Sequence, residues 1–120
     1  MAPARAIPRL LVRHKLTFGD IKSWNIHEAF AAQVIANIHA ASDPAYRRVK
    51  AGVDADLGTF PWERVNPYGG SLSLGHPFAA TGARILSQAV KELATFPPGS
   101  RAIVSICADG GLGTVALLQC

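Results

Sequence analysis

NPYGGSLSLGHPFAATGARI, residues 66–85, and CADGGLG, residues 107–113, are the two glycine-rich stretches of this sequence that say most about its fold. Each stretch places one reactive side chain in a glycine-flanked turn: His76 in the first and Cys107 in the second. The residues between the two turns read as one helix and one strand, an arrangement that can bring both side chains to one pocket. An imidazole and a thiol placed together suit carbon–acyl chemistry, because they can take or give a proton near neutral pH.

Around these turns the pattern alternates between helical and strand-like segments, which predicts a single α/β domain over residues 1–120 with a mixed β-sheet and packed helices. The apolar spacing predicts helices at 8–16, 28–40 and 80–93, and strands at 22–26, 102–106 and 114–118, the last two pairing as a hairpin. Asp43-Pro44 is typical of a helix start, and Gly52 of a helix stop. Residues 17–20 and 109–113 read as turns, and residues 53–66 as a surface loop.

Composition narrows the class of protein. Of 120 residues, 49% are apolar and 17% are charged, which is typical of a globular domain. No apolar run approaches the ~20 residues that span a bilayer. The net charge of +4 fits either a solvated basic surface or weak attraction for an anionic substrate. The basic residues lack the interleaved aromatics of a nucleic-acid surface. With two cysteines and no CxxC pair, the chain fits a reducing setting, and we expect a cytoplasmic protein.

His76 is flanked by Gly75, which allows a backbone turn, and by Pro77, which fixes the direction of the exit. A helix begins soon afterwards, and the positive end of its dipole favours negative charge nearby. A neutral imidazole on that corner can donate a hydrogen bond to a developing oxyanion. The alternative is a histidine that only satisfies loop carbonyls.

Cys107 and His27 have structural alternatives as well. Cys107 ends a strand before a glycine-rich turn, which opens space above the thiol, but a small buried cysteine fits the local pattern too. His27 and Glu28 open an alanine-rich segment, where a helix-dipole role for Glu28 is the simpler interpretation. His27, His76 and Cys107 lack the short ligand spacing of structural zinc sites, so we expect no metal. The glycines precede no Gly-Lys-Ser/Thr sequence, which excludes a phosphate-binding P-loop.

Three blocks, NIHEAFAAQ (residues 25–33), NPYGGSLSLGHPFAATGAR (residues 66–84) and CADGGLG, resemble the signature blocks of the thiolase carboxy-terminal domain. They occur in the family's order and at similar spacing, and the resemblance covers nearly the whole chain. It implies half of the thiolase α-β-α-β-α architecture. The HEAF form of the first block resembles the long-chain, trifunctional-complex type, and so implies an acetyl-CoA C-acyltransferase of fatty-acid β-oxidation.

The resemblance also implies roles for individual residues. His76 would donate to the thioester oxyanion and help to activate a nucleophilic cysteine, and Cys107 would be the acid/base. His27 stands where the family usually has an asparagine that positions a water at the oxyanion hole. Asp109, Gly110 and Gly75 would lie at oxyanion and substrate-binding positions. The substrates would be acyl-CoA and CoA, and no separate cofactor is implied.

Two departures from the family pattern stand out. Asp109 replaces a small residue in the turn after Cys107, where a carboxylate would repel an enolate-like charge. The family's nucleophilic cysteine belongs to an amino-terminal domain that these 120 residues lack. We therefore expect a fragment, a truncated reading frame or one subunit of a split enzyme, which pairs with an amino-terminal half or partner subunit in a homo- or hetero-oligomer.

Two alternatives to a catalytic half stay open. One is a non-catalytic thiolase-like module used for CoA binding or assembly, and the other is an inactive fragment. The condensing enzymes of fatty-acid or polyketide synthesis share the architecture, but they usually use a Cys-His-His or Cys-His-Asn set.

Overall fold

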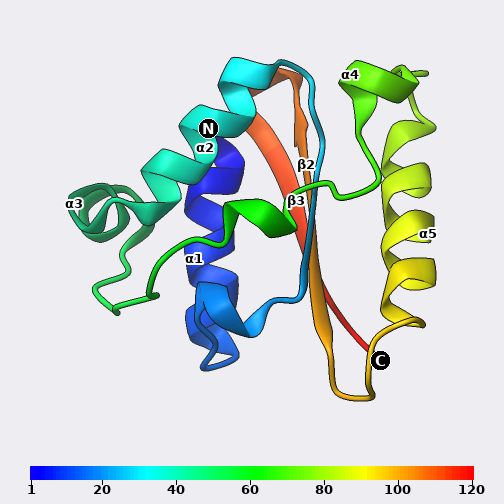
Figure 1. The fold of residues 1–120 in the computed structure, drawn as a ribbon. Coiled ribbons are helices and arrows are strands. Elements are labelled where there is room, and N and C mark those ends of the chain that lie inside the picture. The colour runs from blue at the N-terminus through cyan, green and yellow to red at the C-terminus, as the bar shows by residue number, and fades with distance from the viewer.

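The computed structural model describes residues 1–120 as three layers, with a small sheet between two groups of helices (Figure 1). The helices and helical turns are α1 (Ala2–Arg13), α2 (Ala31–Ser42), α3 (Pro44–Tyr46), a π-helical turn (Arg47–Ala51), α4 (Ser71–Leu74) and α5 (Thr81–Leu93), with 3₁₀ turns at Phe18–Asp20, Trp62–Arg64 and Asp109–Gly111. The strands are β1 (Ser23–Ile26), β2 (Arg101–Ala108) and β3 (Leu112–Gln119). None of the helices is long and apolar enough to cross a membrane.

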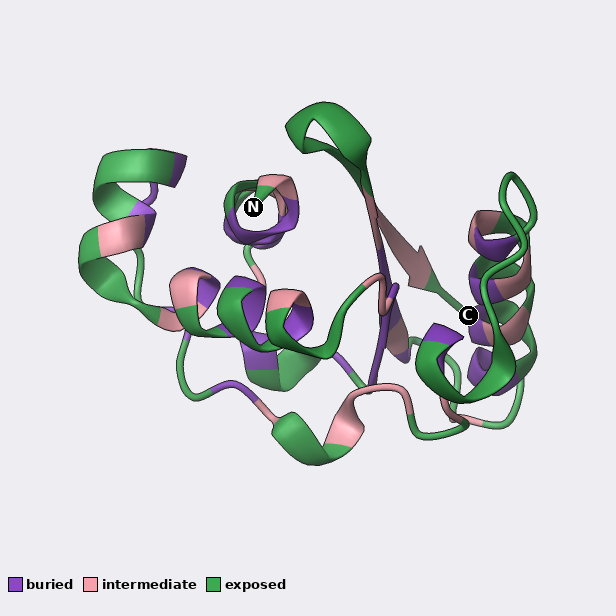
Figure 2. Cartoon of the chain, turned by 90° about the horizontal axis from the view of Figure 1, so that it is seen from above, coloured by how far each residue is buried: buried purple, intermediate pink, exposed green.

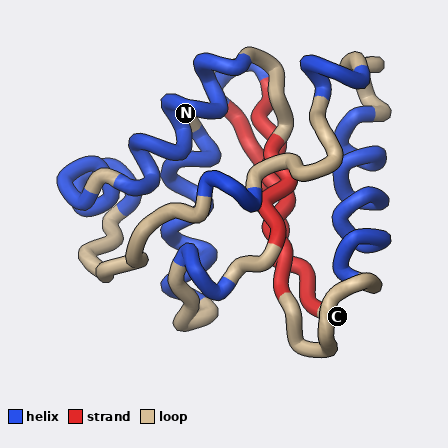
Figure 3. Tube along the Cα trace, in the orientation of Figure 1, coloured by secondary structure: helices blue, strands red, loops and turns tan.

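The sheet has the order β1-β2-β3 and is mixed, as the sequence predicts. β1 runs parallel to β2, with Trp24 opposite Ile103, and β2 runs antiparallel to β3, with Cys107 opposite Gly113. The predicted hairpin is therefore confirmed, and both of its strands extend beyond the predicted bounds. Figure 3 shows the strands crossing the middle of the molecule, with helices on both sides.

The main core lies between the sheet and α1 and α2. It contains twelve buried apolar residues: Ile7, Leu11, Phe18, Ile21, Trp24, Ile26, Val34, Ile38, Ala41, Leu57, Phe60 and Ile103. The opposite face of the sheet holds a cluster of only three, Ile85, Ala89 and Val104, beneath α5. Figure 2 shows the buried side of α5 turned towards the sheet and its outer side exposed.

The first helix begins earlier than predicted. We expected residues 8–16 with Pro8 near the start, whereas α1 begins at Ala2 and carries Pro8 in its interior. Its buried residues are Pro3, Ala4, Ile7, Pro8 and Leu11, which form one helical face against the core. Packing of that face outweighs the cost of a proline inside the helix.

The second helix begins later than predicted, at Ala31 instead of residue 28. The strand pairing continues past β1, because the His27 amide donates to the Ser105 carbonyl at 2.8 Å. Phe30 then takes an extended conformation as the N-cap. The apolar positions that predicted this helix are buried only in part, since Phe30 and Ile35 are 72% and 50% exposed.

Two further predictions about burial need correction. Residues 53–66 lack regular structure over most of their length, but Leu57 and Phe60 are 1% and 5% exposed and belong to the main core. On α5, the apolar positions whose spacing predicted the helix are buried only in part, because Leu86 and Val90 are exposed. The cap signals at Asp43 and Gly52 are confirmed: the Asp43 carboxylate accepts from the Ala45 amide, and Gly52 has a φ of 68°.

Candidate functional site

The candidate site lies at one edge of the sheet, beyond the carboxyl end of β1. His27 directly follows β1, and Cys107 is the second-last residue of the parallel strand β2. Parallel strands end at the same edge, so their following residues meet there. A cavity of about 640 Å³ opens at this edge, and five of the predicted site residues line it: His27, His76, Cys107, Asp109 and Gly110.

His27 is 5% exposed, so most of its ring is withdrawn from water. Its Nδ1 lies 2.9 Å from the hydroxyl of Ser71, the first residue of α4. Burial lowers the pKa of His27 below its usual value, Coulombic interaction with His76 and Arg84 lowers it further, and Glu28 opposes this effect. The imidazole is therefore neutral near pH 7.

His76 is exposed, and its ring lies near that of His27, with 4.4 Å between the ring centroids and 47° between the ring planes. Gly75 has a φ of 93°, which is the turn that its position in the sequence predicts, but it does not itself line the cavity. The Nδ1 of His76 lies 2.6 Å from the hydroxyl of Thr81, the first residue of α5. The predicted corner beside a helix start is thus present.

Cys107 is partly buried, and its thiol lies 3.6 Å from the Gln33 Oε1 atom of α2. The two cysteines occupy different parts of the fold. Cys120 contacts the carbonyls of Pro97 and Ser100 and does not line the cavity. Cys107 is therefore the thiol that shares a cavity with the histidines.

The turn after Cys107 is built on two glycines in left-handed conformations, Gly110 at a φ of 76° and Gly111 at 78°. The Asp109 carboxylate accepts a hydrogen bond from the Gly110 amide at 2.8 Å. The negative charge is therefore held against the turn, at the rim of the cavity.

A side-chain clamp joins the His27 and His76 segments. Asn66 pairs with the backbone of Ile26 through both ends of its amide, at 2.8 and 2.9 Å, and donates to the Glu28 carboxylate at 2.7 Å. Glu28 also accepts from the Leu72 amide at 3.1 Å, and Gly70 packs so closely on it that a Cβ would clash. The dipole role expected for Glu28 is replaced by this tie between two distant segments.

Sequence reasoning missed several residues around the cavity. Gln33, Ser71 and Thr81 contact the predicted side chains directly, although nothing in their local pattern marks them. Exposed apolar side chains complete the lining, chiefly Phe30, Phe78 and Leu112. For Phe78 and Leu112 the available signal was a large apolar residue in a glycine-rich turn, whereas Phe30 has no glycine near it.

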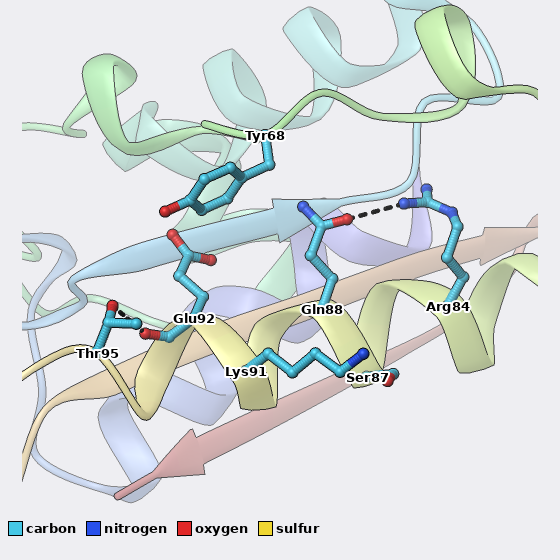
Figure 4. A pocket seen from close by; sticks show the side chains of 7 residues that line it. All are labelled: Tyr68, Arg84, Ser87, Gln88, Lys91, Glu92 and Thr95. Carbon is cyan, nitrogen blue, oxygen red and sulfur yellow. Dashed lines mark hydrogen bonds between the residues drawn. The ribbon is translucent and has the colours of Figure 1, made fainter.

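A second cavity, of about 450 Å³, lies along one flank of α5 and contains none of the predicted site residues. Figure 4 shows Tyr68, from the preceding loop, opposite the Gln88 and Glu92 side chains. The Arg84 Nη1 atom donates to Gln88, whereas its Nε and Nη2 atoms are buried without a partner. Neither cavity brings together three histidine, cysteine or carboxylate groups as a metal site.

The family model described as thiolase, C-terminal domain, matches residues 1–120. The chain is 40% identical over 119 residues to a 3-ketoacyl-CoA thiolase of Erwinia tasmaniensis, covering 99% of this chain and 27% of the relative. It is 38% identical over 119 residues to a probable 3-ketoacyl-CoA thiolase of Caenorhabditis elegans, covering 99% of this chain and 26% of the relative. The chain thus spans about a quarter of the length of these relatives.

Solved structures give the same similarity. The peroxisomal 3-ketoacyl-CoA thiolase of Saccharomyces cerevisiae superposes with a TM-score of 0.71 at 34% identity, over 97% of this chain and 28% of that one. That structure is described as five layers built from two core domains of identical topology. A thiolase of Ascaris suum in complex with coenzyme A superposes with a TM-score of 0.73 at 30% identity, over 99% of this chain and 26% of that one.

Proposed function

Because this chain belongs to the thiolase family, as a carboxy-terminal domain, we propose that it supplies the carboxy-terminal catalytic half of an acetyl-CoA C-acyltransferase. The reaction is the conversion of a 3-oxoacyl-CoA and CoA into a shortened acyl-CoA and acetyl-CoA, as in fatty-acid β-oxidation. The observation that carries the proposal is the convergence of His27, His76 and Cys107 on one cavity. The 3-ketoacyl-CoA thiolases among the relatives support the choice of substrate.

In this proposal Cys107 is the general acid and base. During thiolysis its S–H gives a proton to the two-carbon enolate that departs as acetyl-CoA, and during condensation the thiolate takes a proton from the acetyl methyl group. The partly buried thiol, which contacts the neutral amide of Gln33, is suited to both directions.

His76 and His27 act on the thioester and on the nucleophile. His76 takes the proton of the nucleophilic thiol and then donates to the oxyanion, and His27 places a second donor near the same oxygen. The 4.4 Å separation of the two ring centroids supports a shared target.

The nucleophilic cysteine comes from an amino-terminal half outside these 120 residues. Cys107 has the acid/base role, and Cys120 lies away from the cavity. The exposed apolar lining of the cavity supports a covering partner, either such a half or a partner subunit, in a homo- or hetero-oligomer.

The experiment is thiolysis of acetoacetyl-CoA and of a longer 3-oxoacyl-CoA. It compares the 120-residue chain alone with the chain mixed with a separately expressed thiolase amino-terminal half. We expect activity only in the mixture, with Cys107→Ala lowering kcat by about 10²–10⁴ and the matched control Cys120→Ala leaving it unchanged. Full activity of Cys107→Ala, or activity of the chain alone, would contradict the proposal.

A non-catalytic module that binds CoA is the second candidate, and Asp109 favours it. The carboxylate lies at the rim of the cavity, where an enolate would be repelled. Asp109→Gly in the reassembled enzyme decides between the two. A gain of orders of magnitude over a barely active native chain supports the module, whereas a small change supports the catalytic half.

A further inference from the structure

Two buried hydroxyl groups contact the two imidazoles from outside the cavity lining. Ser71 and Thr81 are 7% and 2% exposed, and neither lines the cavity. Each lies within hydrogen-bond distance of one Nδ1 atom, Ser71 of His27 at 2.9 Å and Thr81 of His76 at 2.6 Å. The Nε2 atom is therefore the nitrogen of each ring that is left for a substrate.

The hydrogen of the Thr81 hydroxyl has a defined acceptor. Its oxygen also lies 3.2 Å from the carbonyl oxygen of Pro77. This contact meets hydrogen-bond geometry, and a carbonyl oxygen can only accept, so we assign Thr81 as the donor to Pro77. The single hydroxyl hydrogen is then used, and Thr81 accepts from the Nδ1–H of His76. In its neutral form, His76 consequently carries a lone pair on Nε2.

Ser71 is in the opposite situation. Its hydroxyl has no hydrogen-bond partner other than the Nδ1 of His27. If Nδ1–H donated to Ser71, the hydroxyl hydrogen would be buried without an acceptor, which is costly. Ser71 therefore donates to Nδ1, and the hydrogen of the neutral His27 ring is on Nε2.

We propose that Ser71 and Thr81 are positioning residues that set opposite tautomers in the paired histidines, a donor Nε2–H on His27 and an acceptor Nε2 on His76. The effect of these tautomers on catalysis, described next, rests on the proposed function. The thiol proton of the nucleophile moves to Nε2 of His76, the sulfur electron pair forms the new bond to carbon, and the carbonyl electron pair moves to the oxygen. His27 already presents an N–H to that oxygen before any proton moves.

The neutral state of His27 agrees with this assignment. Burial is the main cause that lowers its pKa, Coulombic interaction with His76 and Arg84 adds to the lowering, and Glu28 opposes it. A charged ring would donate from both nitrogens, and Ser71 would then have to accept.

The test is the tautomeric state of each histidine in the ¹⁵N-labelled 120-residue chain at neutral pH, observed through two-bond nitrogen–proton couplings by NMR. We expect the proton on Nε2 in His27 and on Nδ1 in His76. His14 and His39, which are exposed, serve as internal references. A proton on Nδ1 of His27, or on Nε2 of His76, would overturn the inference.

Variants separate positioning from folding. Ser71→Ala should move the His27 tautomer ratio roughly three- to tenfold towards the Nδ1–H form, whereas Ser71→Thr should retain the native ratio. Ser73→Ala is the matched control, because Ser73 lies on the same helix and bonds only the Gly70 carbonyl. An unchanged ratio in folded Ser71→Ala would contradict the role of Ser71. Thr81→Val and Thr81→Ser make the same comparison for His76.

The assembled enzyme gives an independent readout. There Ser71→Ala should lower kcat more than it changes KM, and Ser71→Thr should restore it. If the tautomers are as expected but no assembled enzyme is active, the proposed function fails and the assignment stands. If the enzyme is active with the tautomers reversed, the assignment fails and the proposed function stands.

Discussion

The two faces of the sheet differ in chemistry, although they share the same short strand. β1 turns Trp24 and Ile26 towards α1 and α2, where they join the main core of twelve apolar residues. It turns Ser23 and Asn25 towards α5, where both donate to the buried Glu92 carboxylate, at 2.6 and 3.2 Å. One face is thus held by apolar packing and the other by buried hydrogen bonds around a small apolar cluster.

The candidate site lies where the two faces meet. The His27 side chain contacts Ser71 of α4, whereas the Cys107 thiol contacts Gln33 of α2. The imidazoles and the thiol are therefore positioned by different layers of the fold. A substitution in one helical layer can lower the free energy of unfolding without removing the side-chain contacts made by the other layer. The contributions of the two faces can therefore be measured separately.

The largest effect is expected on the apolar face. Trp24 is fully buried and packs against Phe18 and Phe60, with ring centroids 6.0 and 4.7 Å from its own. Trp24→Ala should lower the free energy of unfolding by about 3–5 kcal/mol, because it removes this contact area and leaves a cavity. Urea unfolding followed by circular dichroism measures the change.

Trp62, which is 45% exposed, provides the control. Trp62→Ala should cost about 1 kcal/mol or less. Equal losses in the two variants would show that the apolar face does not dominate stability.

A smaller loss is expected beneath α5. Ile85 is 5% exposed and belongs to the three-residue cluster. Ile85→Ala should cost about 2 kcal/mol, at the low end for a buried isoleucine, because few apolar neighbours surround it. Leu86→Ala, at the adjacent exposed position, should cost less than about 1 kcal/mol. A loss for Ile85→Ala as large as that for Trp24→Ala would remove the contrast between the faces.

The buried hydrogen bonds of Glu92 should contribute less again. Glu92→Gln keeps the size of the side chain but removes the charge that strengthens the bonds from Ser23 and Asn25. We expect a loss of about 1 kcal/mol in the free energy of unfolding. Glu63→Gln, on an exposed 3₁₀ turn, is the control and should have no measurable effect. An unchanged free energy of unfolding in Glu92→Gln would show that the charge of Glu92 does not stabilise the polar face.

The smallest expected effect is a pH dependence that arises from His27. Its pKa is lowered in the folded chain, chiefly by burial, so the unfolded chain binds the proton more tightly. The contribution of His27 to the free energy of unfolding is therefore fully present above about pH 6.5, the unfolded pKa of histidine. It is lost as the pH falls towards the lowered pKa of the folded chain.

Urea unfolding at pH 7.5 and at pH 5.5 should show this decrease in the native chain. His27→Gln should show less of it, while His14→Gln should behave as the native chain does. Asp20 does not interfere, because its pKa is lowered from 3.8 by bonds from the Thr17 amide and hydroxyl, and its loss of stability begins at more acidic pH. A steeper loss in His27→Gln than in the native chain would reverse the sign that we predict.

Much of this protein is determined by local sequence. Alternation and helical spacing predict the mixed sheet, the hairpin and α5, because period-2 and period-3.6 patterns are read over a few residues. Asp43 and Gly52 mark helix ends for the same reason, since a cap acts on its own turn. The glycine turns at His76 and Cys107 are local features too, and the three blocks identify the family.

Which distant groups meet depends on how the whole chain folds. Pro8 lies inside a helix because a buried face offsets its cost, and Leu57 and Phe60 join the core from a segment without a period. Glu28 accepts hydrogen bonds from a loop about forty residues away and does not cap its own helix. Ser71 and Thr81 hold the two imidazoles through single hydrogen bonds. Such a bond depends on the position of one atom in the folded chain, and neither spacing nor composition encodes that position.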